Sequence, residues 1–207
     1  MTPIVIDLEW NQPLKGRTPV TGLRDEIIQI GAAKIDPEGN ALDTFSQIVK
    51  PFYYTKLNKD VSELTLLTDA DLETGLPFAQ AMDALRAWCG EDYVFLSWSA
   101  TDAYVLYRNC EKFEYGTDWI PAFYDAQLMF DDYEMQEDRS WPLNYALYHF
   151  GEKPDGAHNA LADVLSTALV LKHLDLAEAL EDEYFLCGPG SGAAEEEQET
   201  GDGHVDG

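Results

Sequence analysis

The sequence is short of positive charge. It has 13 Lys and Arg residues against 39 Asp and Glu residues, and its formal net charge is −26. This balance excludes the ordinary kind of nucleic-acid binder, which holds phosphates through a broad basic patch. Seven of the basic residues lie between positions 15 and 59, and eleven acidic residues lie beyond Lys172. If the chain binds a polyanion, we expect that it binds short substrates with low affinity, and that the affinity depends strongly on salt.

Long hydrophobic runs and a cysteine pattern are also missing. The N-terminal apolar run ends at Asp7, so we expect no signal peptide and no membrane-spanning segment. The three cysteines, Cys89, Cys110 and Cys187, have no metal-ligand spacing and cannot all pair. These features predict a cytoplasmic protein in a reducing compartment, with no membrane partner.

The hydrophobic content, 45% of 207 residues, is enough for one core. We predict one domain over residues 1–187 and an acidic, disordered tail over residues 188–207. The tail begins with a Gly/Pro/Ser-rich segment and contains no aromatic residue. Its role is either solubilising or partner-binding.

The apolar pattern predicts an α/β fold in which a mixed sheet is flanked by helices. The turn-rich residues 36–40 predict a hairpin between the second and third strands. We expect strands at 4–10, 26–36, 42–50, 93–97 and 122–125, and helices at 77–89, 103–112, 141–149 and 160–183.

Asp7 and Glu9 stand on the first expected strand. Because side chains alternate along a strand, these two acids share one face, about 6.6 Å apart, and Leu8 points the other way. Two like charges on one face of a central strand are costly unless a cation lies between them. Alternatively, the strand runs out into solvent and carries the acids on its exposed end.

His158 and Asp163 flank the start of the last long helix. Asn159 is a good N-cap, and Asp163 then lies about one turn into the helix. Both side chains can reach the same point near the start of the helix. Alternatively, His158 is an ordinary loop histidine, and Asp163 is a first-turn acid favoured by the helix dipole. Asp102 follows the buried run at 93–97, and acids at such helix starts often serve as caps. Four acids around one site nevertheless indicate divalent cations and phosphodiester chemistry.

In combination, these residues resemble the DEDD superfamily of 3′–5′ exonucleases, in the subgroup whose fifth residue is histidine (DEDDh). Asp7 and Glu9 match the first motif, Asp102 the second, and His158 with Asp163 the third, in the family's order. The resemblance covers about residues 3–175 and implies a ribonuclease H-like fold.

The resemblance implies a two-metal hydrolysis with Mg²⁺ or Mn²⁺. The four acids Asp7, Glu9, Asp102 and Asp163 would hold the ions, and His158 would take the proton of the attacking water. The implied partner is the 3′ end of single-stranded RNA or DNA; protein partners cannot be inferred. The predicted substrate contacts are Leu8 and Trp10 against the last bases, Lys15 and Arg17 near the phosphates unless they are merely solvated, and Thr65.

Ser97 and Trp98 resemble the exoribonuclease branch of the subgroup. Two positions depart from the family: Leu66 replaces a common glycine, and Thr101 replaces a common aromatic beside Asp102. The alternatives to an exoribonuclease are a DNA exonuclease with a proofreading or repair role and a non-catalytic binding or regulatory module on the same fold.

Overall fold

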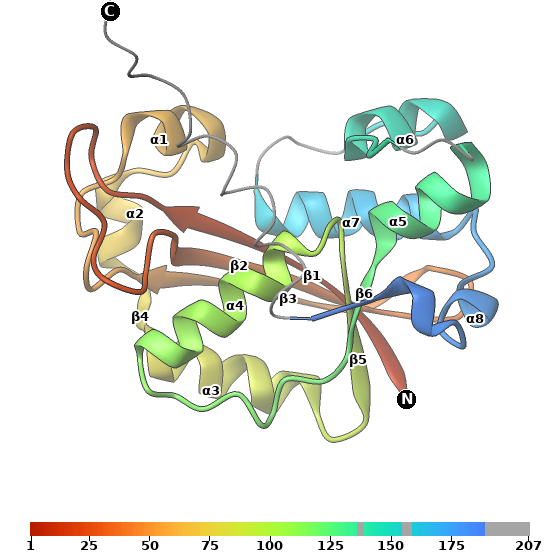
Figure 1. Ribbon diagram of the computed structural model, residues 1–207, viewed down its shortest axis with the longest axis horizontal. Helices are drawn as coiled ribbons and strands as arrows, with labels where there is room; N and C mark the ends of the chain where they lie inside the picture. The colour runs from red at the N-terminus through yellow and green to blue at the C-terminus, as the bar shows by residue number, and fades with distance from the viewer. Residues whose placement is uncertain (136–138, 155–158, 189–207) are drawn as a thin grey trace, which may run out of the picture.

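A seven-stranded mixed sheet organises the computed structural model, which describes residues 1–135, 139–154 and 159–188. The strand order is β4-β3-β2-β1-β5-β6-β7, and helices cover both faces (Figure 1). β1, β2 and β3 are antiparallel, whereas β5 and β6 run parallel to β1. The predicted mixed sheet flanked by helices is therefore confirmed. The strands are β1 (Thr2–Asn11), β2 (Glu26–Ile35), β3 (Ala41–Lys50), β4 (Leu76–Pro77), β5 (Tyr93–Ser97), β6 (Phe123–Asp125) and β7 (Leu186–Cys187).

The predicted last helix is too long. α7 ends at Leu171, and a separate helix, α8, begins after Asp175, whose carboxylate accepts the backbone N–H of Glu178. This cap starts a new helix at the point where the apolar stripe suggested continuation. The helices are α1 (Lys59–Thr65), α2 (Asp69–Glu73), α3 (Phe78–Cys89), α4 (Thr101–Lys112), α5 (Ala126–Phe130), a π-helix (Asp131–Met135), α6 (Leu143–Phe150), α7 (Ala160–Leu171), α8 (Leu176–Ala179) and a 3₁₀ turn (Glu183–Phe185). No helix in the described ranges combines the length and apolarity that a membrane span requires.

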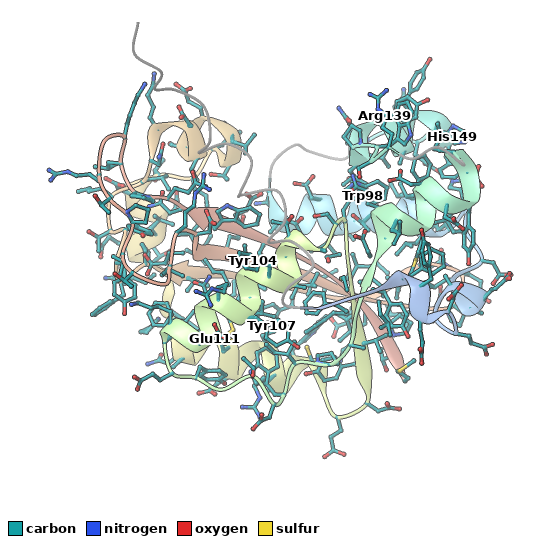
Figure 2. The ribbon with its side chains drawn as sticks, viewed as in Figure 1. Trp98, Tyr104, Tyr107, Glu111, Arg139 and His149 are labelled. Carbon is teal, nitrogen blue, oxygen red and sulfur yellow. The ribbon has the colours of Figure 1, made fainter. Side chains whose placement is uncertain are left out.

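α4 shows the division between core and surface on one helix. Leu106 and Cys110 are buried in the core, while Tyr104, Tyr107 and Glu111 follow the side of α4 seen in Figure 2. The i, i+3, i+7 spacing of these three residues places them on one helix face.

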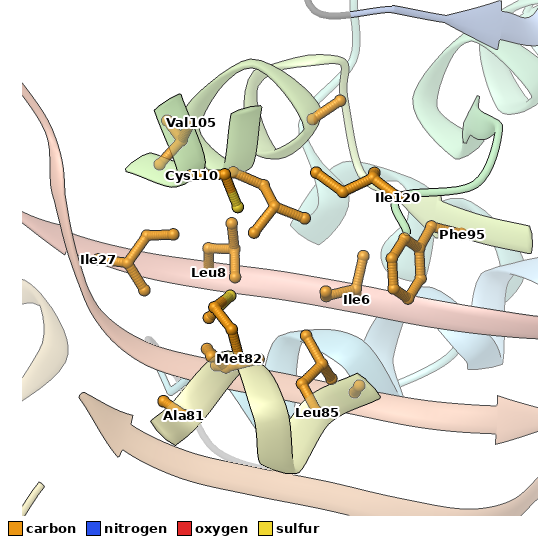
Figure 3. Packing of buried hydrophobic residues seen from close by; sticks show 14 of the residues in the cluster. Ile6, Leu8, Ile27, Ala81, Met82, Leu85, Phe95, Val105, Cys110 and Ile120 are labelled. Atoms are coloured by element: carbon orange, nitrogen blue, oxygen red, sulfur yellow. The ribbon is translucent and has the colours of Figure 1, made fainter. Parts of the chain in front are cut away.

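β1 divides the core into two layers. Ile6 and Leu8 pack into the cluster under α3 and α4, where Leu8 lies close to Met82 (Figure 3). Val5 points the other way and packs with Val164 of α7. The alternation of the strand continues to its polar residues, so Asp7 and Glu9 belong to the α7 side.

α7 approaches β2 very closely at Gly31, the residue paired with Asp7 across the sheet. A Cβ atom at Gly31 would lie 2.3 Å from the carbonyl carbon of Ala160 and 2.5 Å from the amide nitrogen of Leu161. The helix start is also tied to β2, because the Ala160 N–H donates to Oε1 of buried Gln29 at 3.3 Å. Glycine in this strand therefore brings the first turn of α7 onto the face that carries Asp7.

We predict that Gly31→Ala destabilises the protein by about 1–3 kcal/mol, the usual range for overpacking against atoms that cannot move aside. The melting temperature should fall by about 2–4 °C for each kcal/mol. Divalent-metal binding should also weaken, because α7 would have to shift. Thermal unfolding and metal titration measure the two effects. Gly188→Ala is the matched control, since no atom lies within 4 Å of its Cβ position; equal stability of both variants would contradict the prediction.

Candidate active site

Three carboxylates meet where β1 passes beneath the first turn of α7. Asp7 and Glu9 come from one face of β1, and Asp163 comes from α7. One oxygen atom from each residue lies within 4.8 Å of the other two. The structure thus brings two acids that the sequence analysis placed on the first strand together with one that it placed on the last long helix.

Asp102 reaches the same region from α4. It is only 5% exposed, and its Oδ1 accepts the backbone N–H of Leu8 at 2.9 Å. A tight turn precedes it: Ser99 has a φ of 112°, and the Ser97 hydroxyl donates to the Ser99 carbonyl at 2.6 Å. Asp102 therefore lies against the backbone of β1, outside the group of three but adjacent to it.

Burial and mutual repulsion raise the pKa values of Asp7, Glu9 and Asp102. Burial first, then the charges of Asp102, Glu9 and Asp163, raise the pKa of Asp7 well above its ordinary value. Burial and Asp163 raise the pKa of Glu9 to about 7. Burial, opposed by the Leu8 N–H, raises the pKa of Asp102 to about 7. Without a counter-charge, the group therefore holds protons that isolated carboxyl groups would release.

The donor set fits a hard divalent cation. The three clustered residues offer only carboxylate oxygens, which suit Mg²⁺ or Mn²⁺ better than zinc. A cation would also replace the protons that the raised pKa values imply, so the acids could be ionised together. Asp7, Glu9 and Asp163 could hold one ion, with Asp102 next to them.

Asp125 is an acid of this region that the sequence analysis missed. It ends β6, the strand beside β5, and its Oδ1 accepts the N–H of Leu128 at 3.0 Å as the N-cap of α5. Burial raises the pKa of Asp125, and its charge in turn raises the pKa of Asp102. Its position at a strand end was the available signal, but an ordinary capping acid gives the same signal.

A pocket of about 420 Å³ opens beside the three clustered acids. Trp10 and Thr65, both predicted to contact substrate, line this pocket. The Thr65 hydroxyl donates to the Val61 carbonyl at 2.9 Å, so it also supports the end of α1. The other lining residues are Leu8, Gln12, Asp60, Val61 and Leu64.

The structure argues against the predicted base contact of Leu8. Leu8 is 3% exposed, and its side chain packs in the core layer beneath β1 (Figure 3), whereas Asp7 belongs to the other face of the strand. Alternation along the strand forces this placement. Leu8 contributes its backbone N–H, which binds Asp102.

Lys15 and Arg17 do not line the acid pocket. Both are exposed in the loop between β1 and β2. Arg17 borders a second hollow of about 320 Å³, together with Tyr53 and Lys56. Pro13 lines this second hollow, and the preceding residue, Gln12, lines the acid pocket, so neighbouring residues of the chain line the two hollows.

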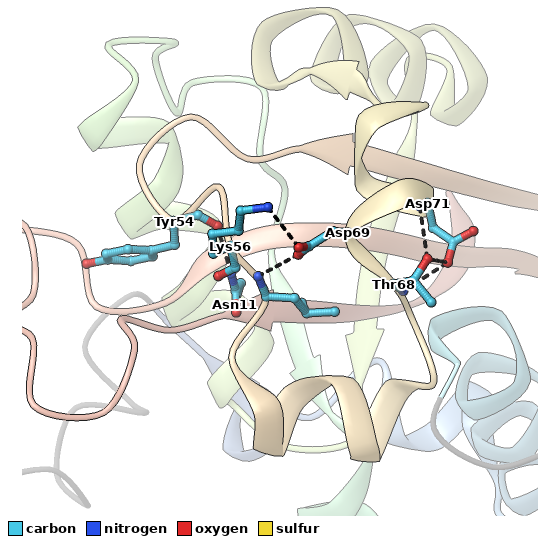
Figure 4. Close-up of polar contacts among 7 residues, drawn as sticks. Asn11, Tyr54, Lys56, Thr68, Asp69 and Asp71 are labelled. Atoms are coloured by element: carbon cyan, nitrogen blue, oxygen red, sulfur yellow. Dashed lines mark hydrogen bonds and ion pairs between the residues drawn. The ribbon is translucent and has the colours of Figure 1, made fainter.

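Asn11 fixes the wall of the acid pocket opposite α7. Its buried side chain donates to the carbonyl oxygens of Tyr54 at 2.7 Å and Lys56 at 2.9 Å, and it accepts the N–H of Asn58 at 2.9 Å. Asn58 is the N-cap of α1, and Lys56 pairs with Asp69 at the start of α2 (Figure 4). These bonds hold α1, which carries Thr65, against the end of β1.

Leu66 adopts the left-handed conformation, with φ 59° and ψ 8°, and ends α1. This explains why glycine is favoured at the corresponding position of the family that the sequence resembles, since glycine adopts positive φ without steric cost. The Leu66 side chain is 76% exposed, so burial does not repay the strain.

His158, the predicted proton acceptor, lies outside the described residues, as does the predicted tail beyond Gly188. The described chain resumes at Asn159, whose side chain caps α7 by accepting the Leu161 N–H at 3.1 Å. The N-cap predicted from the sequence is therefore confirmed.

Comparison with known sequences supports an exonuclease domain. The sequence model of the RNase_T family, described as Exonuclease, matches residues 4–171. The chain is also similar to "Probable 3'-5' exonuclease KapD" of Bacillus subtilis (strain 168), with 29% identity over 109 residues. That match covers 52% of this chain and 52% of the relative, so the chain spans about half of the relative's length.

Comparison with solved structures confirms the fold. The nuclease domain of 3'hExo, a DEDDh family member bound to rAMP, superposes with a TM-score of 0.72 at 21% identity, over 89% of this chain and 94% of that chain. A 3'-exonuclease that recognises the histone mRNA stem-loop gives 0.72 at 20% identity, over 89% and 84%. E. coli Exonuclease I with a dT13 oligonucleotide gives 0.61 at 18% identity, over 83% and 40%. The predicted ribonuclease H-like architecture is confirmed.

We predict that Asp7→Asn stabilises the metal-free protein at neutral and higher pH. The pKa values of these acids are higher in the folded protein than in the unfolded chain, so their ionisation opposes folding. Wild-type stability should therefore fall as pH rises from about 4 through 7. Removing one charge relieves that repulsion. At pH 8 in EDTA the melting temperature should rise by at least about 3 °C, the shift that about 1 kcal/mol produces.

The same comparison at about pH 4, near the ordinary pKa of a carboxyl group, is the control, because the protonated acids no longer repel one another and the difference should vanish. Adding Mg²⁺ or Mn²⁺ at pH 8 should stabilise wild type and leave Asp7→Asn nearly unchanged. A variant that is less stable than metal-free wild type at pH 8 would contradict the electrostatic account.

We predict that Leu66→Gly stabilises the protein by up to about 1 kcal/mol, because a left-handed leucine costs more than the extra freedom of glycine in the unfolded chain. Thermal unfolding measures this change. Leu64→Gly is the matched control: Leu64 is 50% exposed but lies within α1, where glycine costs about 1 kcal/mol. Destabilisation by both substitutions would show that Leu66 is not strained.

Proposed function

Because this chain belongs to the RNase_T exonuclease family, we propose that it removes nucleotides from the 3′ end of single-stranded nucleic acid, with RNA as the preferred substrate. The reaction is hydrolysis: water adds to phosphorus, the bond between phosphorus and the 3′ oxygen breaks, and a 5′-mononucleotide leaves. The meeting of Asp7, Glu9 and Asp163 within 4.8 Å, next to buried Asp102, is the observation that carries this proposal.

We assign metal binding to these four carboxylates and expect two Mg²⁺ or Mn²⁺ ions. Such ions, when bound, offset the charge on the reacting phosphate and favour ionisation of water. The protein contributes rigidity: β1 fixes Asp7 and Glu9, α7 fixes Asp163, and the Leu8 N–H orients Asp102. Asp125, which caps α5, would keep negative charge behind Asp102.

We assign proton removal to His158. Its place before Asp163 matches the third motif of the DEDDh exonucleases, and imidazole is a suitable base near neutral pH. His158 would accept a proton from the attacking water, and the departing 3′ oxygen would take a proton from solvent. A general base must be neutral to act, so activity should fall at acidic pH.

The last nucleotide would occupy the pocket of about 420 Å³. Trp10, Val61 and Leu64 provide an apolar wall for its base, and Thr65 shapes the end of that wall. The register of β1 against β2 shifts between Glu9 and Trp10, where Ile28 is the extra residue on β2. Trp10 packs partly against the core cluster and also lines the pocket. Apolar contacts with the base are tolerant of base identity.

Upstream phosphates would pass the loop between β1 and β2. Arg17 and Lys56 border the adjoining hollow of about 320 Å³, and Lys15 lies exposed in the same loop. These cations are few against a net charge of −26, so we expect binding to weaken sharply as salt increases.

The RNA preference is supported by Ser97 and Trp98, which resemble the exoribonuclease branch. Among the structural neighbours, one recognises an mRNA stem-loop and another binds a DNA oligonucleotide, so DNA is the alternative substrate. Both residues also position the turn before Asp102, through the Ser97 hydroxyl and the packing of Trp98 on Phe130.

The decisive experiment is a degradation assay with 5′-labelled and 3′-labelled single strands of RNA and DNA, with Mn²⁺ or Mg²⁺. We expect a 3′-labelled strand to release labelled mononucleotide at once and a 5′-labelled strand to shorten stepwise, with RNA degraded faster. Asp7→Asn should retain less than about 1% of the activity, since losing one catalytic group typically costs at least 10²-fold.

His158→Ala, assayed alongside, should lose roughly 10²–10⁴-fold activity and keep metal affinity, as expected for a base that is not a ligand. Faster degradation of DNA would favour the DNA exonuclease alternative. Strand binding without metal-dependent hydrolysis would favour a non-catalytic module, and full activity of Asp7→Asn would contradict the site.

A further inference from the structure

An arginine is stacked on aromatic rings outside the acid pocket. The guanidinium carbon of Arg139 lies 4.2 Å from the centroid of the Trp141 ring. The Trp141 ring stacks on Tyr145 of α6, with the centroids 4.1 Å apart and 27° between the planes. We refer to Arg139, Trp141 and Tyr145 as the α6 stack.

The position of Trp141 is fixed by its backbone. Its N–H donates to Oδ1 of Asp131 at 3.2 Å, and its carbonyl oxygen accepts Nε2 of Gln127 at 2.7 Å. The ring packs at the edge of the cluster that contains Phe130. Its indole Nε1 is buried and finds no acceptor among the described residues. The ring is therefore held through its faces and its backbone, which is how a preformed stacking surface is built.

Arg139 is exposed and has no carboxylate partner in the described part of the chain. By contrast, Lys50, Lys59 and Arg108 each form an ion pair with a nearby glutamate. In a protein with 39 acidic residues, a stacked arginine without such a partner is available for a negatively charged or planar ligand.

The stack lies on the face of the sheet that carries the candidate active site, because Trp141 and Tyr145 pack in a cluster with Val170 of α7. α1 and α6 rise on the same side of the sheet, on either side of the N-terminal end of α7 (Figure 1). In the view of Figure 2, Arg139, which precedes α6 in the chain, lies nearer to α1 than His149 of α6 does.

Trp98, four residues before Asp102, lies 6.0 Å from Phe130 between ring centroids, and Trp98, Trp141 and Tyr145 all pack against the cluster that contains Phe130. This cluster connects the segment before Asp102 to the α6 stack.

We propose that the α6 stack binds a nucleotide of the single-stranded substrate that lies further to the 5′ side than the nucleotide adjoining the cleaved bond, and is therefore absent from a dinucleotide. The inference rests on the proposed function and adds a second contact to it. The guanidinium of Arg139 would stack on a base and contact the adjoining phosphate, extending the column formed by Trp141 and Tyr145. Bases in single strands are commonly held on arginine planes and aromatic rings, largely without sequence preference.

Strand length provides the test. Steady-state kinetics would be measured on a dinucleotide and on a strand of about ten nucleotides, which is long enough to reach a second contact. Arg139→Ala should raise KM for the long strand about tenfold, with kcat nearly unchanged, as for the loss of one stacked base. The dinucleotide should be unaffected. Arg139→Lys, which keeps the charge but loses the plane, should restore only part of the affinity.

Arg86→Ala is the matched control. Arg86 also lies over aromatic rings, 5.9 Å from Tyr115 and 5.6 Å from Trp119, but it belongs to α3 on the opposite face of the sheet. Both substrates should be processed normally by this variant. An unchanged KM of Arg139→Ala for the long strand would overturn the proposal, and so would an equal effect on the dinucleotide.

A binding measurement separates this inference from the proposed function. Fluorescence anisotropy of a labelled single strand in EDTA gives an affinity that does not depend on hydrolysis. If wild type binds the strand in EDTA but does not cleave it when Mg²⁺ or Mn²⁺ is added, the proposed function fails, and a tenfold loss of affinity in Arg139→Ala still supports the stack. If affinity is the same in both proteins, or wild type does not bind at all, the stack proposal fails.

Discussion

The close approach of α7 to β2 at Gly31 is the contact on which the site depends. Backbone atoms of Ala160 occupy the space where any side chain at position 31 would begin, and Gly31 pairs with Asp7 in the sheet. Asp163 therefore reaches Asp7 and Glu9 because a single strand position lacks a Cβ atom. The Gln29 bond to the Ala160 N–H fixes the same approach from a second point.

This approach forces acids together in a protein that already carries excess negative charge. Burial and repulsion both raise the pKa of Asp7, and the backbone of β1 cannot move to separate it from Glu9. Without a metal, the repulsion among these acids thus lowers the stability of the folded protein, and the packing of the surrounding core must offset this loss. Such local destabilisation is common where groups are held for catalysis. A bound cation would turn that cost into stabilisation, so metal affinity and folding are coupled.

Much of the fold and the identity of the acids could be predicted, because the relevant signals are local. β-branched residues mark β1, the period of two places Asp7 with Glu9, and an apolar stripe marks α7. The unpredicted features depend on contacts across the fold. A glycine in a strand, such as Gly31, indicates that another segment lies close but not which segment it is. Asp125 cannot be distinguished in the sequence from an ordinary N-cap. The apolar residue Leu174 continues the hydrophobic pattern past Leu171, so the sequence does not mark the end of α7.

The net negative charge also limits how this protein could bind a polyanion such as a nucleic acid. At a net charge of −26, long-range attraction cannot gather the substrate, so affinity must come from short-range contacts that the surface charge does not oppose. The proposed stacking on Trp10 in the acid pocket and on the Arg139–Trp141 pair beside α6 would be of this kind, because it would act on the bases and not only on the phosphates. Bases that are paired in a duplex are not free to stack in this way. An acidic surface with aromatic contacts on both sides of the site should therefore select unpaired 3′ ends.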